Sequence, residues 1–411
     1  MTGIEFATVP GRLFEADGAD TRATHWARLA DEVVVWADAP DPVRRLPYSA
    51  SPRRAAGLAL VTQVGRSFQD AHPDVTVLVD HGRHLVVDAE AVPAPTADER
   101  LNWRTEPLER DAVVVDRPVL AARESDSVTA DLLALLSRSS YLGQLERITG
   151  PTTRHSTSSG FADAAAEAAA DLGSFGYVVA RVPIAVGAGR GSNVVANRVG
   201  SGEATRGLIV VTAHLDSVNH EGGESAPAPG ADDNASGAAG VLELGRVLAT
   251  RGWRHDLRLI LFGGEEQGLF GSIEHVAGLS AGERERIIAV INMDMVGRRN
   301  TAEPGVLLEG APVSRALIDD LVAAAATWTG LAVSTSMSPF ASDHVPFINA
   351  GVPAVLTIED NDTANRDVHS ARDVLSTLDP ALAMEILRMN LAVLAGCLDG
   401  IPEGIRVADY A

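Results

Sequence analysis

Short apolar runs rich in Val, Ile and Leu recur along the chain beyond about residue 120. Such runs are typical of strands that are buried on both faces of a parallel sheet. Strands are predicted at residues 193–198, 208–212, 257–262, 287–291 and 354–358. Helical spacing of apolar residues predicts helices at residues 128–136, 161–172, 238–248, 313–326 and 380–398. The alternation predicts an α/β fold, in which a mostly parallel central sheet has helices on both faces.

The first part of the chain has a different pattern, with shorter apolar runs and more turn residues. It predicts strands at 33–36, 75–79, 85–87 and 113–115, a hairpin turn at 80–83 and a helix at 53–68. We therefore expect two domains: a smaller N-terminal α+β domain at 1–120 and a larger domain at 121–411. The N-terminal domain shows no catalytic constellation. A cap over a substrate cleft, a folding aid or inhibitory segment, and a dimerisation module are all compatible with it.

Acidic and histidine residues gather just past the predicted strands or in the loops that follow them. They are His214, Asp216, Asp233, Glu265, Glu266, Asp294 and His369. Ligand sites in open α/β sheets form at the carboxyl ends of strands, so these residues are predicted to converge on one edge. Gly263 and Gly264, directly before the two glutamates, permit a tight turn at this edge.

Histidine and carboxylate side chains together suit a site for two divalent metal ions, with zinc as the favoured metal. Two such ions about 3.5–4 Å apart can clamp both oxygens of a hydrolysis. If Asp233 bridges the ions, His214 and Asp294 would hold one of them, and Glu266 and His369 the other. Three carboxylates against two dications leave one net positive charge, which favours a metal-bridging hydroxide near neutral pH.

Two further residues then have roles outside the ligand set. Glu265 remains as the general base, because its neighbour in the chain would point to the metal. Asp216 lies two residues after His214 at a strand end, so both can face the same side and the carboxylate can orient the imidazole. Taken singly, His-x-Asp at a strand end is more often structural, and adjacent glutamates are usually a solvated face. Five segments at matching positions favour the metal site.

Six strings occur in an order that resembles a known family: HLDS, GADDNASG, GGEEQGLFGS, NMDMVG, SDHVPFINAGVP and HSARD. They are similar to motifs of the di-zinc exopeptidase family, which contains bacterial leucine-type aminopeptidases, glutamate carboxypeptidase and glutaminyl cyclases. The resemblance covers about residues 121–411 and implies a zinc-exopeptidase-like fold. It also implies that the metal ligands are His214, Asp233, Glu266, Asp294 and His369. Glu265 matches the family's general base, and Asp216 matches the residue that supports the first histidine.

Three positions need comment against the family pattern. The family's bridging carboxylate comes directly before Asn234, which selects Asp233 over Asp232. His344 matches a pocket residue rather than the ligand histidine. Several members carry a tyrosine before the last ligand histidine, where its hydroxyl stabilises the tetrahedral intermediate. This chain has Val368 there, so oxyanion stabilisation is expected to come from the metals or from another donor.

Composition limits the partners. The net charge of -21 argues against nucleic acid and against anionic membrane, and no uninterrupted apolar run is long enough to span a bilayer. The N-terminal sequence lacks a secretory signal pattern and Cys397 is the only cysteine, so a cytoplasmic location is expected. All 34 basic residues counted as Lys or Arg are arginines. His220, His255 and His275 are predicted to be surface residues.

These observations predict a metal-dependent exopeptidase, with an aminopeptidase favoured because an acidic site would attract the free amino group of a peptide or aminoacyl substrate. Glu265 would deprotonate the bridging water and return the proton to the leaving amine. The alternatives are a carboxypeptidase or glutaminyl cyclase of the same family and a noncatalytic peptide-binding relative. Manganese or cobalt could replace zinc, a homo-oligomer is compatible with the sequence, and side-chain specificity is left open.

Overall fold

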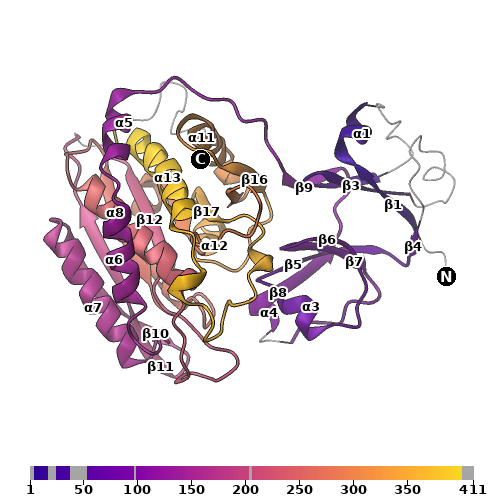
Figure 1. The fold of residues 1–411 in the computed structure, drawn as a ribbon, viewed down its shortest axis with the longest axis horizontal. Coiled ribbons are helices and arrows are strands. Elements are labelled where there is room, and N and C mark those ends of the chain that lie inside the picture. The colour runs from indigo at the N-terminus through magenta and orange to yellow at the C-terminus, as the bar shows by residue number, and fades with distance from the viewer. Residues whose placement is uncertain (1–3, 17–24, 38–52, 97–98, 203–205, 400–411) are drawn as a thin grey trace. The chain divides into compact units, whose positions relative to one another are not determined.

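The structure is a computed structural model that describes residues 4–16, 25–37, 53–96, 99–202 and 206–399 (Figure 1). The chain divides into two compact units. Unit 1 consists of Met1–Pro118 and of two short later segments, Ser334–Ala341 and Asn361–Arg366. Unit 2 consists of Val119–Val333, Ser342–Asp360 and Asp367–Ala411. The sequence did not indicate that two segments of the later chain would group with the N-terminal part.

Unit 2 is built on a mixed sheet with the strand order β10-β11-β13-β12-β14-β17-β15. Its strands are β10 (Val178–Val186), β11 (Gly189–Arg198), β12 (Leu208–His214), β13 (Asp256–Phe262), β14 (Ile287–Met293), β15 (Gly305–Glu309) and β17 (Ala354–Glu359). The four central strands β13, β12, β14 and β17 are parallel, whereas β11 and β15 join the sheet in antiparallel orientation. The predicted α/β fold with a central parallel sheet is therefore confirmed.

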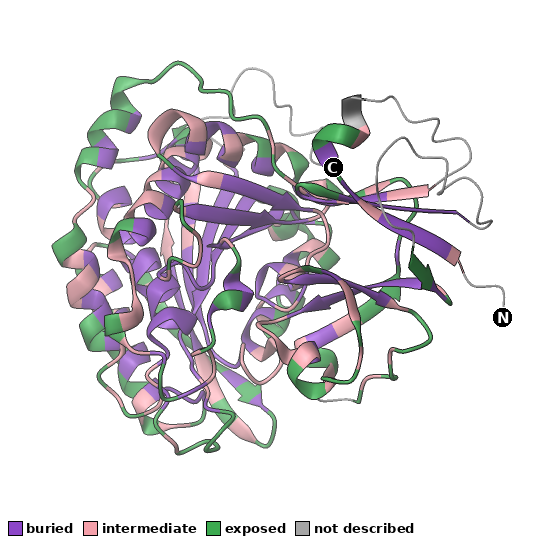
Figure 2. Ribbon diagram, turned by 45° about the vertical axis from the view of Figure 1, so that its right-hand side comes forward, coloured by how far each residue is buried: buried purple, intermediate pink, exposed green. Residues whose placement is uncertain are grey.

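Helices cover both faces of this sheet, as Figures 1 and 2 show. They are α5 (Ser127–Ala134), α6 (Arg138–Ile148), α7 (Ser159–Ser174), α8 (Gly237–Leu248), α9 (Phe270–Ala277), α10 (Ala281–Arg286), α11 (Arg315–Trp328), α12 (His344–Asn349) and α13 (Pro380–Asp399). Successive strand residues point to opposite faces. Leu208 and Val210 pack with Val276 of α9 and Phe347 of α12, while α8 and α13 contact β12 as well. Both faces are thus buried.

Helix α13 has the length and apolar composition of a membrane-spanning helix. Its most apolar window is 61% buried inside the protein, however, and its buried residues include Leu387, Leu391 and Leu394. That burial is typical of a core helix in a packed domain.

Unit 1 contains two sheets. One has the order β16-β9-β2-β3-β1-β4, and its strands are β1 (Ile4–Pro10), β2 (His25–Leu29), β3 (Glu32–Ala37), β4 (Arg53–Ala55), β9 (Ala112–Asp116) and β16 (Ala332–Ser336). The other has the order β6-β7-β5-β8, with β5 (Leu58–Gln63), β6 (Val77–His81), β7 (His84–Asp88) and β8 (Trp103–Pro107). Its helices, α1 (Gly11–Ala16), α3 (Ser67–Ala71) and α4 (Glu99–Asn102), are short.

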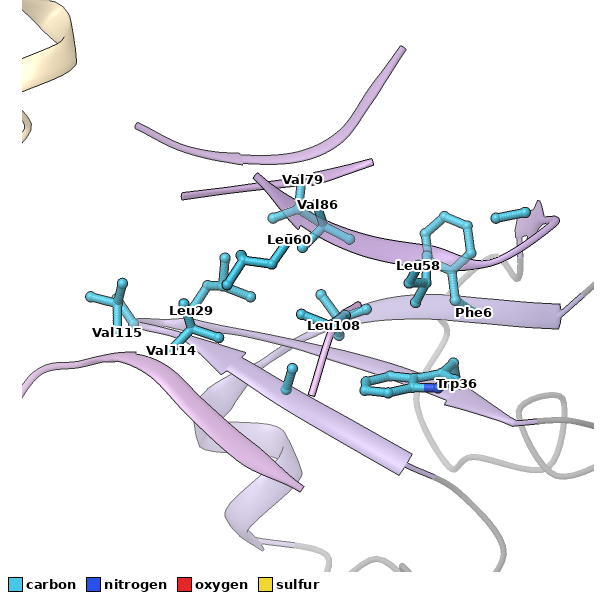
Figure 3. Packing of buried hydrophobic residues seen from close by; sticks show 14 residues of the cluster. Phe6, Leu29, Trp36, Leu58, Leu60, Val79, Val86, Leu108, Val114 and Val115 are labelled. Carbon is cyan, nitrogen blue, oxygen red and sulfur yellow. The ribbon is translucent and has the colours of Figure 1, made fainter. Parts of the chain in front are cut away.

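The predicted helix at 53–68 is wrong, because most of this segment forms β4 and β5. Leu58 and Leu60 pack in the cluster between the two sheets (Figure 3), while Ala59 and Val61 pack on the opposite face. Both faces of β5 are therefore buried. Burial on both faces removes the polar alternation that marks a half-exposed strand, and the remaining apolar run reads equally well as a helix.

The hairpin predicted at 80–83 is confirmed and joins β6 to β7. Gly82 has a φ of +65°, as a tight hairpin turn requires. Arg83 is buried and binds the two later segments of unit 1: Nη1 lies 3.3 Å from Oδ2 of Asp362, and Nη2 donates to the carbonyl of Phe340 at 2.6 Å. The hairpin thereby connects all three pieces of the unit.

Candidate metal centre

The strand ends of unit 2 position four of the predicted site residues. His214 is the last residue of β12, and Asp294 follows directly after β14. Glu265 and Glu266 lie in the turn between β13 and α9. Because β12, β13 and β14 are parallel neighbours, their carboxyl ends meet at one edge of the sheet.

Loops supply the other two metal-ligand candidates. Asp233 lies in the turn Ala231–Ser236 before α8, and its peptide bond to Asn234 is cis. His369 lies in the loop after β17 and has a φ of +56°. A left-handed backbone at a residue other than glycine is sparsely populated and clusters at functional sites.

Glycines shape the turn that carries the two glutamates. A Cβ atom on Gly263 would lie 2.6 Å from Cζ of Phe161 and 2.9 Å from the carbonyl oxygen of Ser192. Gly264 has a φ of +71°, which glycine adopts without steric cost. The turn can therefore pass close to its neighbours and present Glu265 and Glu266 at the strand edge.

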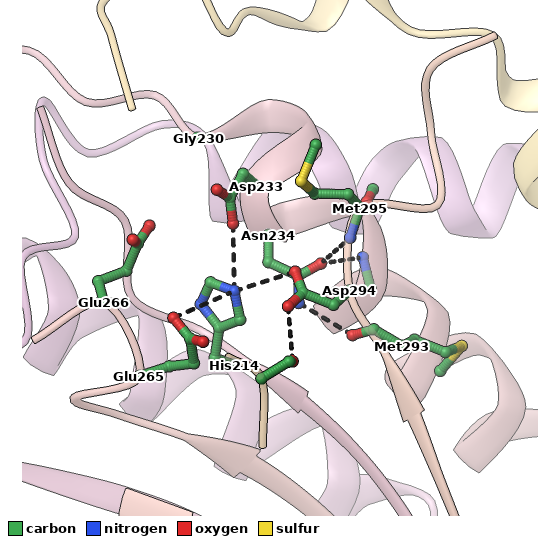
Figure 4. A network of polar contacts seen from close by, with 12 residues as sticks. His214, Gly230, Asp233, Asn234, Glu265, Glu266, Met293, Asp294 and Met295 are labelled. Atoms are coloured by element: carbon green, nitrogen blue, oxygen red, sulfur yellow. Dashed lines mark hydrogen bonds and ion pairs between the residues drawn. The ribbon is translucent and has the colours of Figure 1, made fainter. Parts of the chain in front are cut away.

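The carboxylate of Asp233 lies between two groups of side chains. Figure 4 shows its contact with His214. Its Oδ1 lies 3.1 Å from Nε2 of His214, and that nitrogen lies 3.2 Å from Oδ1 of Asp294. Its Oδ2 lies 3.0 Å from Nε2 of His369, which lies 3.0 Å from Oε2 of Glu266. Ligand atoms on one tetrahedral zinc ion, each bonded at 2.0–2.1 Å, are about 3.3 Å apart. Both groups therefore have the spacing of donor atoms around a metal ion.

Further donor atoms lie within reach of these groups. One donor atom each from His214, Asp233 and Glu266 lie within 4.8 Å of one another, and the same holds for His214, Glu265 and Asp294. The structure thus brings together all the residues predicted as metal ligands, and it places Glu265 beside the His214 group.

Asp216 lies beside the imidazole of His214. Its Oδ1 lies 3.5 Å from Nδ1 of His214, and its backbone carbonyl lies 3.2 Å from the same nitrogen. Oδ2 of Asp216 accepts a hydrogen bond from the backbone N–H of Glu266 at 3.3 Å. A proton on Nδ1 would leave Nε2 free to bind a metal. Asp216 therefore connects the two groups through one buried carboxylate.

A buried hydrogen-bond chain that sequence analysis missed orients Asp294. Thr212 donates to Oδ1 of Asn292 at 2.7 Å, and Nδ2 of Asn292 donates to Oγ of Ser342 at 2.8 Å. Ser342 donates in turn to Oδ2 of Asp294 at 2.7 Å. This arrangement leaves Oδ1 of Asp294 facing His214. The NMD and SDH strings contain Asn292 and Ser342, but their connection depends on the pairing of distant strands.

Asp373 is a second missed residue. Its two carboxylate oxygens accept the backbone N–H groups of Asp232 and Asp233 at 2.9 and 3.0 Å, so it fixes the loop that presents the Asp233 carboxylate. Burial raises the pKa of Asp373 to about 6, although these two hydrogen bonds favour its charged form. Its signal was the HSARD string, in which it lies four residues after His369.

Neighbouring charges shift the pKa values of the histidines and of Asp233 in this site. Burial alone would lower the pKa of His214, but the carboxylates of Glu265 and Asp294 raise it well above its ordinary value. The pKa of His369 is likewise raised by Glu266 and Asp233 against the effect of burial. Burial would raise the pKa of Asp233, but hydrogen bonds from both histidines lower it. In the absence of metal, protons on the histidines therefore neutralise part of the acidic charge.

The pKa of Glu265 and the pKa of Glu266 are both raised. Burial raises the pKa of Glu265 well above its ordinary value, with His214 acting in the opposite sense. Burial also raises the pKa of Glu266 to about 7, again opposed by a histidine, His369. A carboxyl group with a raised pKa is suited to exchanging a proton with a reactant.

Four other predictions concern residues beside this centre. His344 was expected to be a pocket residue. It is instead fully buried in the core, with Nε2 3.4 Å from Oε1 of Glu309. His255 is buried and accepts a hydrogen bond from the backbone N–H of Gly207, so its predicted surface position is wrong. His220 is exposed, and its ring centroid lies 4.5 Å from that of His369. Val368 packs against an apolar cluster.

Comparison with known proteins agrees with the chemistry of this site. Residues 193–394 match the sequence profile of peptidase family M28. A probable zinc metalloprotease of Leptosphaeria maculans is 29% identical over 56% of this chain and 62% of its own length. The aminopeptidase YwaD of Bacillus subtilis is 34% identical over 35% of this chain and 30% of its own length. A probable leucine aminopeptidase of Trichophyton verrucosum is 30% identical over 46% and 52%. The chain thus spans less than two thirds of these relatives.

Solved structures share the fold at lower identity. The LapA aminopeptidase of Legionella pneumophila superposes with a TM-score of 0.60 at 15% identity, covering 97% of this chain and 99% of that protein. An aminopeptidase from Aneurinibacillus gives a TM-score of 0.55 at 17% identity, over 66% and 96%. A glutaminyl cyclase of Porphyromonas gingivalis gives 0.52 at 21% identity, over 63% and 98%. These likenesses concern the fold, which the aminopeptidases and the cyclase have in common.

Proposed function

Because residues 193–394 match the sequence profile of peptidase family M28, we propose that this protein is a metal-dependent exopeptidase that acts as an aminopeptidase. The observation that carries the proposal is the position of Asp233, whose two oxygens each lie within 3.1 Å of a different histidine nitrogen. A carboxylate shared in this way is the bridge that a site for two metal ions requires.

The residues present fit two zinc ions. His214 and Asp294 would hold one ion, Glu266 and His369 the other, and Asp233 both, in keeping with the nitrogen and oxygen ligands that zinc takes. The relative that is named a probable zinc metalloprotease supports zinc. When bound, the ions would supply Lewis acidity at the scissile carbonyl and make a water molecule easier to deprotonate.

Glu265 would move the proton. Its Oε2 lies 3.9 Å from Nε2 of His214, and its side chain retains 11% exposure, so the carboxylate borders the His214 group on one side and solvent on the other. It would take a proton from the attacking water and return it to the leaving amine. Asp216 would hold the imidazole of His214, and Ser342 would hold Asp294, so that neither ligand turns during the reaction.

The charges around His369 favour a free amino group as the recognised end of the substrate. A carboxypeptidase would need a cation to bind the terminal carboxylate. Arg372, three residues after His369, contacts both oxygens of Glu221 at 2.9 and 3.0 Å. Arg298 lies 2.6 Å from Asp367. Both arginines therefore already bind acids. With Glu265 and Asp216 counted beside the three carboxylate ligands, five carboxylates would face two dications, and the resulting single negative charge would attract an amine.

The first test measures metal content per chain together with hydrolysis of matched substrates. The substrates are aminoacyl p-nitroanilides with a free amino group and the same compounds after N-acetylation. We expect about two metal ions per chain and hydrolysis of the free-amino compounds only. Cleavage of the acetylated compounds, or release of C-terminal residues from peptides, would contradict the aminopeptidase assignment.

The control variant is Glu265→Gln, which keeps the shape of the side chain and removes its basicity. It should bind metal as the wild type does and lose about 10²–10⁴-fold in kcat. One metal per chain with cyclisation of N-terminal glutamine would favour a glutaminyl cyclase. Two metals without hydrolysis of any peptide, ester or acylated amino acid would favour a peptide-binding role.

A further inference from the structure

Arg154 is a fully buried arginine that lies beneath the candidate metal centre in unit 2. Its guanidinium donates to four backbone carbonyls: Nε to Leu215 at 2.8 Å, Nη1 to Ile148 at 3.3 Å and to Pro229 at 2.5 Å, and Nη2 to Gly230 at 3.0 Å. Two of these carbonyls belong to the segments that present metal ligands. Leu215 lies between His214 and Asp216, and Gly230 lies three residues before Asp233.

The backbone of Arg154 is attached to one of the same segments. Its N–H donates to Oγ of Ser217 at 3.3 Å, and its carbonyl accepts the N–H of Ser217 at 3.3 Å. A Cβ atom on Gly230 would lie 3.0 Å from Nη2 of Arg154 and 2.4 Å from the carbonyl oxygen of Asp233. The bridging loop therefore packs directly on the guanidinium.

The charge of Arg154 is unusual for a buried cation. Within the described part of the chain, no carboxylate oxygen lies within 4.0 Å of its guanidinium. Burial lowers its pKa to about 10, and the carboxylates of Asp373, Asp216 and Asp233 oppose that effect, so the group stays protonated at neutral pH. Isolated buried charges are costly unless surrounding groups compensate them. Here the compensation comes from backbone carbonyls and from the acidic ligands at longer range.

We propose that Arg154 is a positioning residue of the metal centre, which fixes the segments of His214 and Asp233 relative to each other before metal binds. This inference rests on the proposed metal site. The planar guanidinium donates in several fixed directions and can bind three chain segments at once. Its positive charge also reduces repulsion among the clustered carboxylates, so the ligands can stay close in the metal-free protein.

The test compares Arg154→Lys and Arg154→Gln with a matched control, Arg258→Lys. Lysine keeps the charge but loses the planar set of donors, and glutamine loses the charge. Arg258 lies near the start of β13, away from Glu265, has 16% side-chain exposure and binds Asn197 and Glu283. Zinc dissociation constants are measured by competition with a chromophoric chelator. Both Arg154 variants should bind zinc about 10–100-fold more weakly than the wild type, and the control should bind as the wild type does.

Arg154→Lys that folds and binds zinc as tightly as the control would overturn the inference. A second measurement uses the wild type alone and decides the question if the variants do not fold. Hydrogen exchange at the amides of residues 213–217 and 231–235 should be nearly as slow without metal as with zinc. Protection that arises only when zinc is added would contradict a preformed site. If the wild type binds no metal at all, the proposed function fails independently of Arg154.

Discussion

Asp232 and Asp233 are neighbours in the chain, yet their carboxyl groups behave in opposite ways. Hydrogen bonds from two histidines lower the pKa of Asp233 against burial. Burial, together with the nearby Asp373, raises the pKa of Asp232 to about 8. Asp232 is hydrogen-bonded to Glu359, another buried acid with a raised pKa. The pattern GADDNASG distinguishes the two positions only through Asn234, whereas the structure separates them by their partners.

The Asp232–Glu359 pair has a consequence for stability. A carboxyl group with a raised pKa in the folded state binds its proton more tightly there than in the unfolded state, so the stability it contributes falls as the pH rises from about 4 to 8. The side-chain amide introduced by Asp232→Asn can donate a hydrogen bond to Glu359 without taking up a proton. The substitution should raise the melting temperature of the metal-free protein at pH 9 by several degrees and change it little at pH 5. Equal changes at both pH values would contradict a shared proton.

The site residues differ in how far the sequence predicts them. His214, Glu265 and Asp294 follow apolar strands directly, so local pattern places them. Asp373 and Ser342 act through hydrogen bonds to backbone or side chains that are distant in the sequence. Arg154 binds carbonyl groups, which every residue has, so no residue pattern marks its partners.

At the scale of elements, the sequence predicts a strand or helix best where the length and composition of its apolar run distinguish the two. The predicted strand at 208–212 forms the core of β12, and the predicted helix at 380–398 matches α13 closely. Helix α6 was missed because it is rich in polar residues, although Tyr141, Leu145 and Ile148 lie on one buried face. The strand predicted at 193–198 forms part of β11, but its hairpin partner β10 was missed because β10 is largely exposed.

The turn after β13 allows a test at this scale. Gly263→Ala would place a Cβ atom 2.6 Å from Phe161, in a turn that presents both glutamates. We expect a lower melting temperature and a loss of hydrolysis at least tenfold larger than the loss of folded protein. The matched control is Gly173→Ala in α7, where a Cβ atom has open space. That change should stabilise the helix by about 0.5–1 kcal/mol. Wild-type activity of Gly263→Ala would show that the turn can relax.

For the whole molecule, metal should couple the segments of unit 2. Its ligands come from distant points of the chain, so bound zinc would stabilise the folded state over the unfolded state. Chelation is expected to abolish hydrolysis and lower the melting temperature, and zinc should restore both. The melting temperature of the wild type with and without chelator is the measurement, with Glu265→Gln as the control that binds metal without turnover. An unchanged melting temperature would argue against ligands that span the domain.

The composition of unit 1 bears on the order in which the molecule can be made. Arg83 is translated early, but its partner Asp362 follows 279 residues later, a delay of about 15–55 s at 5–20 residues per second. Until then the hairpin lacks that carboxylate, and the unit lacks two of its segments. The N-terminal unit therefore cannot mature first, as N-terminal domains commonly do. Nascent chains stalled before residue 361 should leave it sensitive to protease, and chains that extend beyond unit 2 should protect it. Unit 1 would thus complete its fold only after most of unit 2 has been translated.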